Sequence, residues 1–284
     1  MIFFFSGTGN TRWVAQIMAK ATGERLIAMC GDDTPTHYTL EPDERIGFCF
    51  PVHGWQPPKV VRRFIARLSI DNPQGHYCYA LCTCGDSVGL AMEMLDVCLA
   101  AKGLKTDSRF SFVMPESYVT LPFMLTDTPQ REQSKLENAR LAMPKVTDCV
   151  SQRRKGVDEI KRGPLPWVLS HVIGAVFNAV LITDKPFRVD ADRCAKCGVC
   201  AKVCPMGNIK VKADGLPEWK HHGECTACLA CYHHCPRHAI NYGPLTHRRG
   251  QYYFGRRKDK AQQSPAIHGE AATESNETNN EIKG

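Results

Sequence analysis

The chain opens with the stretch that decides its fold, Ile2-Phe3-Phe4-Phe5-Ser6-Gly7-Thr8-Gly9-Asn10-Thr11. A continuous apolar run of this kind is typical of a parallel strand that is buried on both faces of a sheet. Apolar residues then recur at helical spacing: Val14, Ile17, Met18 and Ala21. The sequence therefore predicts a strand over residues 2–5, a Gly-rich turn and a helix.

The alternation of strands and helices continues to about Ser111. Further strands are expected at Arg25–Met29, Ile46–Phe50, Tyr77–Cys82 and Thr106–Val113. Helices are expected between them at Lys59–Leu68 and Leu90–Ala101, the first introduced by a Pro-Pro pair and the second ended by a glycine. Five strands with intervening helices predict an α/β fold with a doubly wound parallel sheet.

The turn after the first strand carries hydroxyls and glycine amides at the start of a helix, which is a favourable site for an anion. It lacks the Gly-Lys-Ser/Thr ending of a Walker loop and the Gly-x-Gly-x-x-Gly of dinucleotide folds. The run Ser6-Gly7-Thr8-Gly9-Asn10-Thr11 resembles the phosphate loop of flavodoxins, which bind FMN. An ordinary Gly-rich turn is the alternative.

The flavodoxin resemblance implies the strand order 2-1-3-4-5, with FMN outside the carboxyl ends of the strands. It places the isoalloxazine ring between the loops after the third and fourth strands. The residues expected to bind FMN are Ser6, Gly7, Thr8, Gly9, Asn10, Thr11, His53, Gly54, Trp55, Thr83, Cys84, Gly85 and Asp86.

Within those loops the resemblance implies separate roles. Trp55 would stack on the ring, unless it is a packed core residue, and Gly54 would present its backbone to flavin N5 because glycine changes conformation at low cost. Asp86 would lower the flavin potential. The fourth-strand loop has no aromatic residue for the second face of the ring, so Tyr118, a partner or a substrate is expected there.

Cysteine is unusually abundant, with 15 residues in a chain of 284. The series Cys194-x-x-Cys197-x-x-Cys200-x-x-x-Cys204-Pro205 returns 31 residues later, beginning at Cys225. Three thiolates at this spacing can wrap three irons of a [4Fe–4S] cluster, while the fourth lies too far along to close the same cube. Zinc sites use other spacings, usually two Cys-x-x-Cys pairs or a mixture of Cys and His.

This segment resembles bacterial two-cluster ferredoxins, in which the fourth cysteine ligates the other cluster. The resemblance assigns Cys194, Cys197, Cys200 and Cys235 to cluster 1. It assigns Cys225, Cys228, Cys231 and Cys204 to cluster 2. Clusters with a purely structural role are the alternative to clusters that carry electrons.

The remaining cysteines have no ligand spacing and are interpreted as small buried residues: Cys30, Cys49, Cys78, Cys82, Cys84, Cys98 and Cys149. Cys84 is the exception to test, since it lies in an expected flavin loop. Many reduced thiols indicate a cytoplasmic location, and the apolar start lacks the basic segment of a signal peptide. The net charge of +7 would be largely offset by bound clusters and flavin phosphate, so nucleic acid is not expected as a partner.

Four regions are expected: a flavodoxin-like FMN-binding domain over 1–128, a helical connector over 129–186, a small α+β two-cluster ferredoxin domain over 187–254, and a disordered tail over 255–284. The connector predicts one long amphipathic helix or two over 129–162, with a kink expected at Pro144. The uncharged stretch 164–183 is either a membrane segment or a docking helix. A small polar stripe at Ser170, Gly174 and Asn178 favours docking between the modules.

Almost the whole ordered chain thus resembles a fusion of a flavodoxin-like domain with a two-cluster ferredoxin. The resemblance implies an electron-transfer protein that relays electrons between two [4Fe–4S] clusters and FMN, with redox proteins as partners. The alternative is a flavin-dependent oxidoreductase that reduces a small molecule with electrons from the clusters. A third possibility is an interaction module with structural clusters only.

Overall fold

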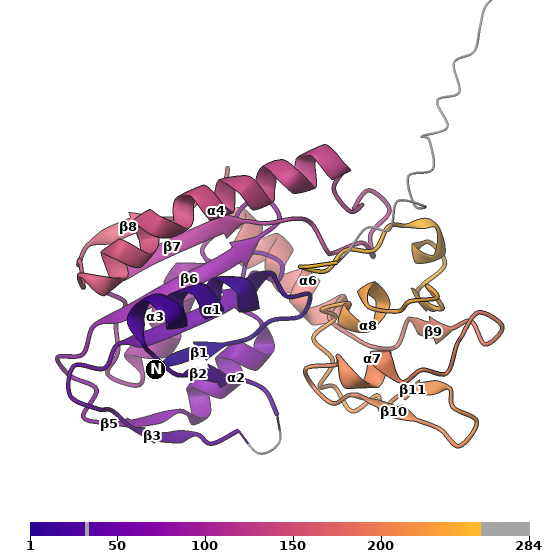
Figure 1. Cartoon of the computed structure of the whole chain (residues 1–284), viewed down its shortest axis with the longest axis horizontal. Coiled ribbons are helices and arrows are strands. Elements are labelled where there is room, and N and C mark those ends of the chain that lie inside the picture. The colour runs from indigo at the N-terminus through magenta and orange to yellow at the C-terminus, as the bar shows by residue number, and fades with distance from the viewer. Residues whose placement is uncertain (32–33, 257–284) are drawn as a thin grey trace, which may run out of the picture.

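The computed structural model describes residues 1–31 and 34–256. Figure 1 shows a larger N-terminal module and a smaller C-terminal one side by side. The larger module is built on a six-stranded sheet in the order β2-β1-β4-β6-β7-β8, with every neighbouring pair parallel. Its strands are β1 (Ile2–Phe4), β2 (Leu26–Ala28), β4 (Ile46–Pro51), β6 (Cys78–Cys84), β7 (Ser108–Val113) and β8 (Val157–Glu159).

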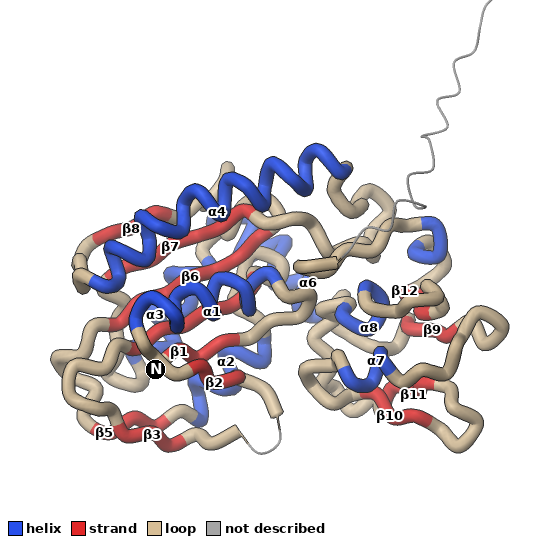
Figure 2. Tube along the Cα trace, viewed as in Figure 1, coloured by secondary structure: helices blue, strands red, loops and turns tan. Residues whose placement is uncertain are grey.

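Helices cover both faces of this sheet (Figure 2). On one face α2 (Lys59–Arg67) and α3 (Ala91–Ala100) pack on Phe3, Phe48 and Phe50. On the other face α1 (Asn10–Thr22) and α4 (Pro129–Ser151) pack on the alternate residues of the same strands, Ile2 and Cys49 among them. The continuous apolar run of β1 therefore supplies two cores, as expected for a buried parallel strand. The architecture is consistent with a flavodoxin-like fold.

The sheet has six strands rather than the expected five, and the helix predicted over 129–162 is wrong beyond Ser151. After a turn at Gly156, which has a φ of 75°, residues 157–159 form the edge strand β8. Its sequence, Val-Asp-Glu, has weak strand propensity. The pairing is supported by an ion pair between Asp158 and Arg109 of the neighbouring strand, with Nε to Oδ1 at 3.0 Å. Pro144 lies inside α4 without ending it.

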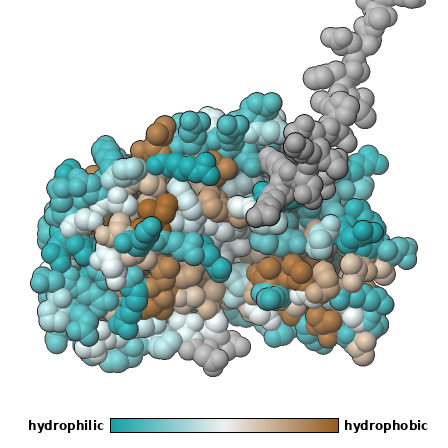
Figure 3. All heavy atoms as spheres, viewed as in Figure 1, coloured by the Kyte–Doolittle hydropathy of each residue, from teal (hydrophilic) through white to brown (hydrophobic). Residues whose placement is uncertain are grey.

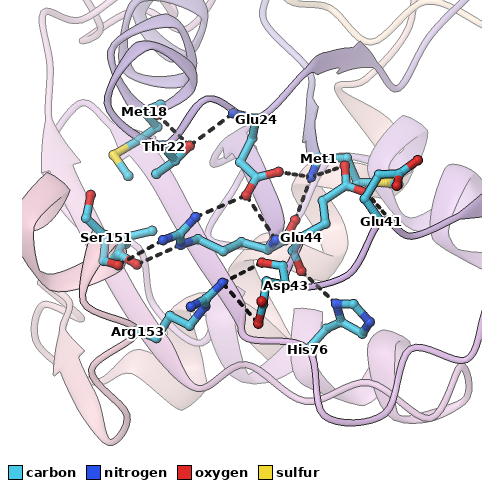
Figure 4. Close-up of polar contacts among 12 residues, drawn as sticks. Met1, Met18, Thr22, Glu24, Glu41, Asp43, Glu44, His76, Ser151 and Arg153 are labelled. Carbon is cyan, nitrogen blue, oxygen red and sulfur yellow. Dashed lines mark hydrogen bonds and ion pairs between the residues drawn. The ribbon is translucent and has the colours of Figure 1, made fainter.

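A second small parallel pair, β3 (His37–Thr39) with β5 (Ser69–Asp71), was also not expected from the sequence. A buried group of charges, drawn in Figure 4, surrounds the N-terminal start of β1. The α-amino group of Met1 contacts Glu24 at 2.7 Å and Glu44 at 2.8 Å, and Arg45 contacts Glu24 at 3.3 Å. Arg45 also donates to the carbonyls of Val150 and Ser151, which joins the start of the sheet to the end of α4.

The uncharged stretch forms α5 (Pro166–Val168), a π-helical turn η1 (Leu169–Ile173) and α6 (Gly174–Val180). Its small polar stripe is buried against the N-terminal module. Its opposite side exposes Trp167, Val172, Val176 and Val180. Within the described ranges 1–31 and 34–256, no helix combines the length and the apolar character that crossing a membrane requires.

The C-terminal module is made of short elements: β9 (Phe187–Val189), α7 (Val199–Lys202), β10 (Ile209–Val211), β11 (Pro217–Trp219), α8 (Ala230–His233), β12 (Ile240–Tyr242) and a 3-10 turn η2 (Thr246–Arg248). Its strands pair antiparallel as β9 with β12 and β10 with β11. A small aromatic core around Phe187, Trp219 and Tyr242 lies between them. Of the expected disordered tail, residues 257–284 lie outside the described part of the chain.

Candidate iron–sulfur and flavin sites

The structure brings the eight cysteines of the repeat together in two groups. Cys194, Cys197, Cys200 and Cys235 line one cavity, beside Lys196 and Arg237. Cys204 lies near the other three, Cys225, Cys228 and Cys231. Burial raises the pKa of the Cys225 thiol to about 12, and burial also raises that of Cys231; neighbouring thiols of the group, Cys204 among them, add to both rises. The ligation of one cluster by each group stays a prediction, which rests on the ferredoxin resemblance.

The backbone of the two cysteine loops repeats along with the sequence. Lys196 and Ala227 have φ values of 54° and 49°, and Gly198 and Leu229 have 70° and 59°. Left-handed φ at a bulky residue such as Leu229 costs about 1–3 kcal/mol, and such strain is kept where the surroundings require it. Both loops therefore adopt the same strained backbone conformation.

Backbone amides support the thiols in the same repeated way. The donors and their sulfur acceptors are Lys196 N to Cys194 Sγ at 3.4 Å, Ala227 N to Cys225 Sγ at 3.4 Å, Asn208 N to Cys204 Sγ at 3.3 Å and Ala239 N to Cys235 Sγ at 3.2 Å. Hydrogen bonds to cluster sulfurs help to set reduction potentials. Among the described residues, no three Cys, His, Asp or Glu side chains converge as ligands of a single metal ion.

The Ser6–Thr11 loop has five consecutive backbone N–H groups, from Gly7 to Thr11, that donate to no acceptor in the described part of the chain. Thr8, Asn10 and Thr11 are nonetheless buried. Buried amides are rarely left without a partner, and a row of them at a helix N-terminus suits a phosphate. The donor set of this loop therefore fits the phosphate of FMN.

The same loop touches the C-terminal module, which the sequence did not indicate. A Cβ on Gly7 would lie 2.6 Å from Cys228 Cβ, so only glycine admits this approach. Phe254 N donates to Thr8 O at 2.8 Å, and its ring stacks on Trp13 at 5.3 Å between centroids. Tyr252 Oη donates to Asn10 Oδ1 at 2.6 Å. Cluster 2 would thus lie directly against the expected phosphate loop.

The His53–Trp55 loop is covered by the polar stripe of the 166–180 segment. Ser170 Oγ donates to Trp55 O at 3.0 Å, and Asn178 Nδ2 donates to His53 O at 2.9 Å. A Cβ on Gly174 would lie 2.2 Å from Gly54 O. Burial lowers the pKa of His53 to about 4, so its imidazole is neutral. The indole of Trp55 donates to Ser87 Oγ at 3.2 Å.

The Thr83–Asp86 loop is joined to the first loop and to the segment after β7. Thr83 Oγ1 lies 2.7 Å from Thr11 Oγ1. The carboxylate of Glu116 packs on Gly85, whose carbonyl accepts from Lys135 Nζ at 2.8 Å. Burial raises the pKa of Cys84 to about 12, which makes a reactive thiolate unfavourable. Asp86 is largely exposed and pairs with Lys161 at 3.1 Å.

The ring end of an FMN site is therefore less open than the phosphate end. The loops expected around the ring contact Phe177, Asn178 and Glu116 of this chain. Tyr118, proposed for the second face, packs on Phe177 at 5.0 Å between ring centroids. A bound ring would have to share or displace these contacts.

Two further residues near the sites were not indicated by any motif. Cys30, interpreted from the sequence as a buried filler, is half-buried near Cys228 and Cys204, and burial together with these thiols raises its pKa to about 11. His233 bridges the modules: Nδ1 accepts from Tyr252 N at 3.1 Å, and Nε2 donates to Ser117 O at 2.6 Å. Such contacts join distant segments and leave no local pattern.

Comparison with known proteins supports the C-terminal assignment. The profile of the 4Fe-4S dicluster domain family matches residues 187–236, which contain all eight cysteines of the repeat. No curated protein matches the chain. A solved structure, rubredoxin oxygen:oxidoreductase from the anaerobe Desulfovibrio gigas, is similar with 15% identity and a TM-score of 0.28. The alignment covers 53% of this chain and 36% of that one. The chain thus contains a segment similar to dicluster domains, which supports bound iron–sulfur clusters.

Proposed function

We propose that this protein transfers electrons one at a time through two [4Fe–4S] clusters. Cluster 1 would be held by Cys194, Cys197, Cys200 and Cys235, and cluster 2 by Cys225, Cys228, Cys231 and Cys204. The observation that carries the proposal is the pair of repeated cysteine loops, with matched left-handed backbone and matched N–H···S bonds. When bound, such clusters supply reversible one-electron chemistry.

We also propose FMN as the third redox group, with its phosphate on the Ser6–Thr11 loop. The five unpaired amides support this assignment, and the Gly7–Cys228 approach would bring cluster 2 close to the cofactor. FMN would supply a centre that accepts one or two electrons. The chain's own contribution is to orient it: Thr11 and Thr83 join two of the loops, and neutral His53 keeps positive charge away from that edge.

The phosphate assignment is tested by titrating purified protein with FMN and with riboflavin, following flavin fluorescence. Binding through the amides predicts that FMN binds at least tenfold more tightly than riboflavin. Equal affinity, or no binding of either, would remove flavin from the proposal and leave the N-terminal module as a support for cluster 2.

The relay is tested by anaerobic reductive titration with visible absorption and EPR. Both clusters should be reduced, and Cys197→Ala should abolish one cluster signal and slow flavin reduction through the clusters. Clusters that resist reduction altogether would indicate a structural role and overturn the proposal.

The alternative function, a flavin-dependent reductase of small molecules, needs a ring face that substrate can reach. The 166–180 segment covers the His53–Trp55 loop, so no observation favours this alternative. We retain redox proteins as the expected partners. A reducing cytoplasmic compartment stays an expectation, based on the number of free thiols.

A further inference from the structure

The two cysteine loops have the same backbone but face different surroundings. In the second loop, Cys228 lies against Gly7, and Ala227 and His233 are 3% and 1% exposed. In the first loop, Cys197 is exposed and belongs to a cavity at the surface of the module. Cluster 2 would therefore face the N-terminal module, and cluster 1 would face outward.

The side chains at equivalent positions of the two cysteine loops also differ, in keeping with these different surroundings. Three basic residues of the first half, Arg193, Lys196 and Lys202, are replaced 31 residues later by Glu224, Ala227 and His233. Glu224 forms an ion pair with Arg63 of the N-terminal module, with Nη1 to Oε1 at 2.9 Å. Hence the second half carries groups suited to packing, and the first half carries cations.

These cations are exposed and form no ion pair within the described part of the chain. Arg193, Lys196 and Lys202 are exposed, as is Arg237, which lines the cluster 1 cavity with Lys196. None of the four forms an ion pair with another described residue, whereas Lys210 and Lys212 nearby are paired with Glu218 and Asp214. Two exposed acidic residues lie near them: Asp192 precedes Arg193 in the chain, and Asp214, the partner of Lys212, also interacts electrostatically with Lys196.

Apolar surface accompanies this charge. Val211, which is 48% exposed, and Pro217 line the same cavity. Figure 3 shows apolar patches next to hydrophilic side chains on the C-terminal module. An apolar centre with a charged rim is typical of a protein docking site, in which the rim charges steer the partner.

We propose that four cations at or beside the cluster 1 ligands dock an acidic one-electron redox protein over cluster 1. Lys196 and Arg237 line the cavity, while Arg193 precedes Cys194 in the chain and Lys202 follows Cys200 by two residues. This inference rests on the proposed function and adds the point at which electrons enter the protein. The reduced partner loses one electron and the iron–sulfur centre of the outward loop gains it, with no bond made or broken. The electron then has a path to cluster 2 and the N-terminal module.

The test is stopped-flow electron transfer from a reduced plant-type [2Fe–2S] ferredoxin, a small acidic protein, to the holoprotein. The double variant Lys196→Glu, Lys202→Glu should reduce the second-order rate constant at low ionic strength at least tenfold and should weaken its salt dependence. The control Lys20→Glu, Lys105→Glu makes the same change of net charge at exposed residues of the other module, and it should change the rate less than twofold. Equal loss in both variants would overturn the proposal.

Two further measurements separate this proposal from the function beneath it. The dissociation constant of the oxidised probe, measured by calorimetry without turnover, should rise by a similar factor in the first variant only. Reduced methyl viologen, a small cation, should react faster with that variant than with wild type. If wild-type transfer from the acidic probe is insensitive to salt, the docking proposal fails even when the clusters are reducible; if dithionite reduces neither cluster, the electron-transfer function itself fails.

Discussion

The two modules of this chain are stabilised in different ways. The N-terminal module buries two apolar layers, one on each face of a six-stranded sheet, and a group of charges around the start of β1. The C-terminal module has strands of only three residues and a small aromatic core. Small cores usually need metals or cross-links to stay folded. The difference teaches that the first module is held by its own side chains, and it leads us to expect that the second depends on bound clusters.

The largest effect should therefore follow from removing iron. Anaerobic chelation, or the variant Cys228→Ala, should abolish hydrogen-exchange protection over much of 187–254, because metal binding and folding are coupled in small metal-binding units. The strands β1, β4 and β6 should keep their protection. Cys228→Ala should also lose at least half of the bound iron.

Cys98→Ser is the matched control for that experiment. This thiol is partly exposed and lies outside both sets of cysteines. The iron content and the hydrogen-exchange protection of the Cys98→Ser variant should equal those of wild type. Unchanged protection of 187–254 in the iron-free protein would contradict the contrast between the modules.

A smaller effect, confined to the N-terminal module, is expected from Glu24→Gln. The carboxylate of Glu24 contacts both the Met1 α-amino group and Arg45, and its side chain is 7% exposed. Removing one partner of a buried ion pair costs about 3–5 kcal/mol. Urea unfolding of the N-terminal module should show a loss of this size with iron content unchanged.

Glu159→Gln provides the comparison, since it breaks the exposed pair with Lys145 at the other end of the sheet. Exposed ion pairs contribute little to stability, so the urea unfolding midpoint of Glu159→Gln should be close to that of wild type. If the two variants unfold alike, the charges around the start of β1 are not part of what holds this module.

The junction between the modules can be broken at Gly7. The variant Gly7→Ala would place a Cβ 2.6 Å from Cys228 Cβ, and such overpacking costs about 1–3 kcal/mol. The EPR signal of cluster 2 should change while that of cluster 1 stays as in wild type. In Gly23→Ala, the added Cβ meets no atom within 4 Å, so both signals should be unaffected despite backbone strain.

The smallest expected effect concerns acid. Burial alone would raise the pKa of Glu44, but hydrogen bonding to the Met1 α-amino group and to the backbone of residue 41 lowers it below the ordinary 4.5. A lowered folded-state pKa contributes stability that is present above about pH 4.5 and is lost as the pH falls through the folded value. Glu44→Gln should flatten the acid limb of the stability curve for the N-terminal module. An unchanged acid limb would show that Glu44 makes no such contribution.

Much of the fold could be predicted from local pattern. The apolar run and Gly-rich turn at residues 2–11 predicted β1 and α1, and the strands near 46, 78 and 108 were found within a few residues of their expected bounds. The stripe at Ser170, Gly174 and Asn178 predicted a docked segment, and all three residues are buried against the His53–Trp55 loop. The edge strand β8 was missed because its short acidic sequence is stabilised by Arg109, a residue far away in the chain.

The sequence by itself predicted the cysteine sets, because cysteines spaced by two and three residues, repeated after 31 residues, are typical of cluster ligation. It also predicted an anion site at the Ser6–Thr11 loop. Only the tertiary structure decided that Cys228 meets Gly7, that Cys197 is exposed, and that Lys196 and Arg237 line the cavity of Cys197. The physical reason is that ligand spacing acts within one loop, whereas the Gly7–Cys228 approach joins residues more than two hundred positions apart and exposure depends on how the two modules pack.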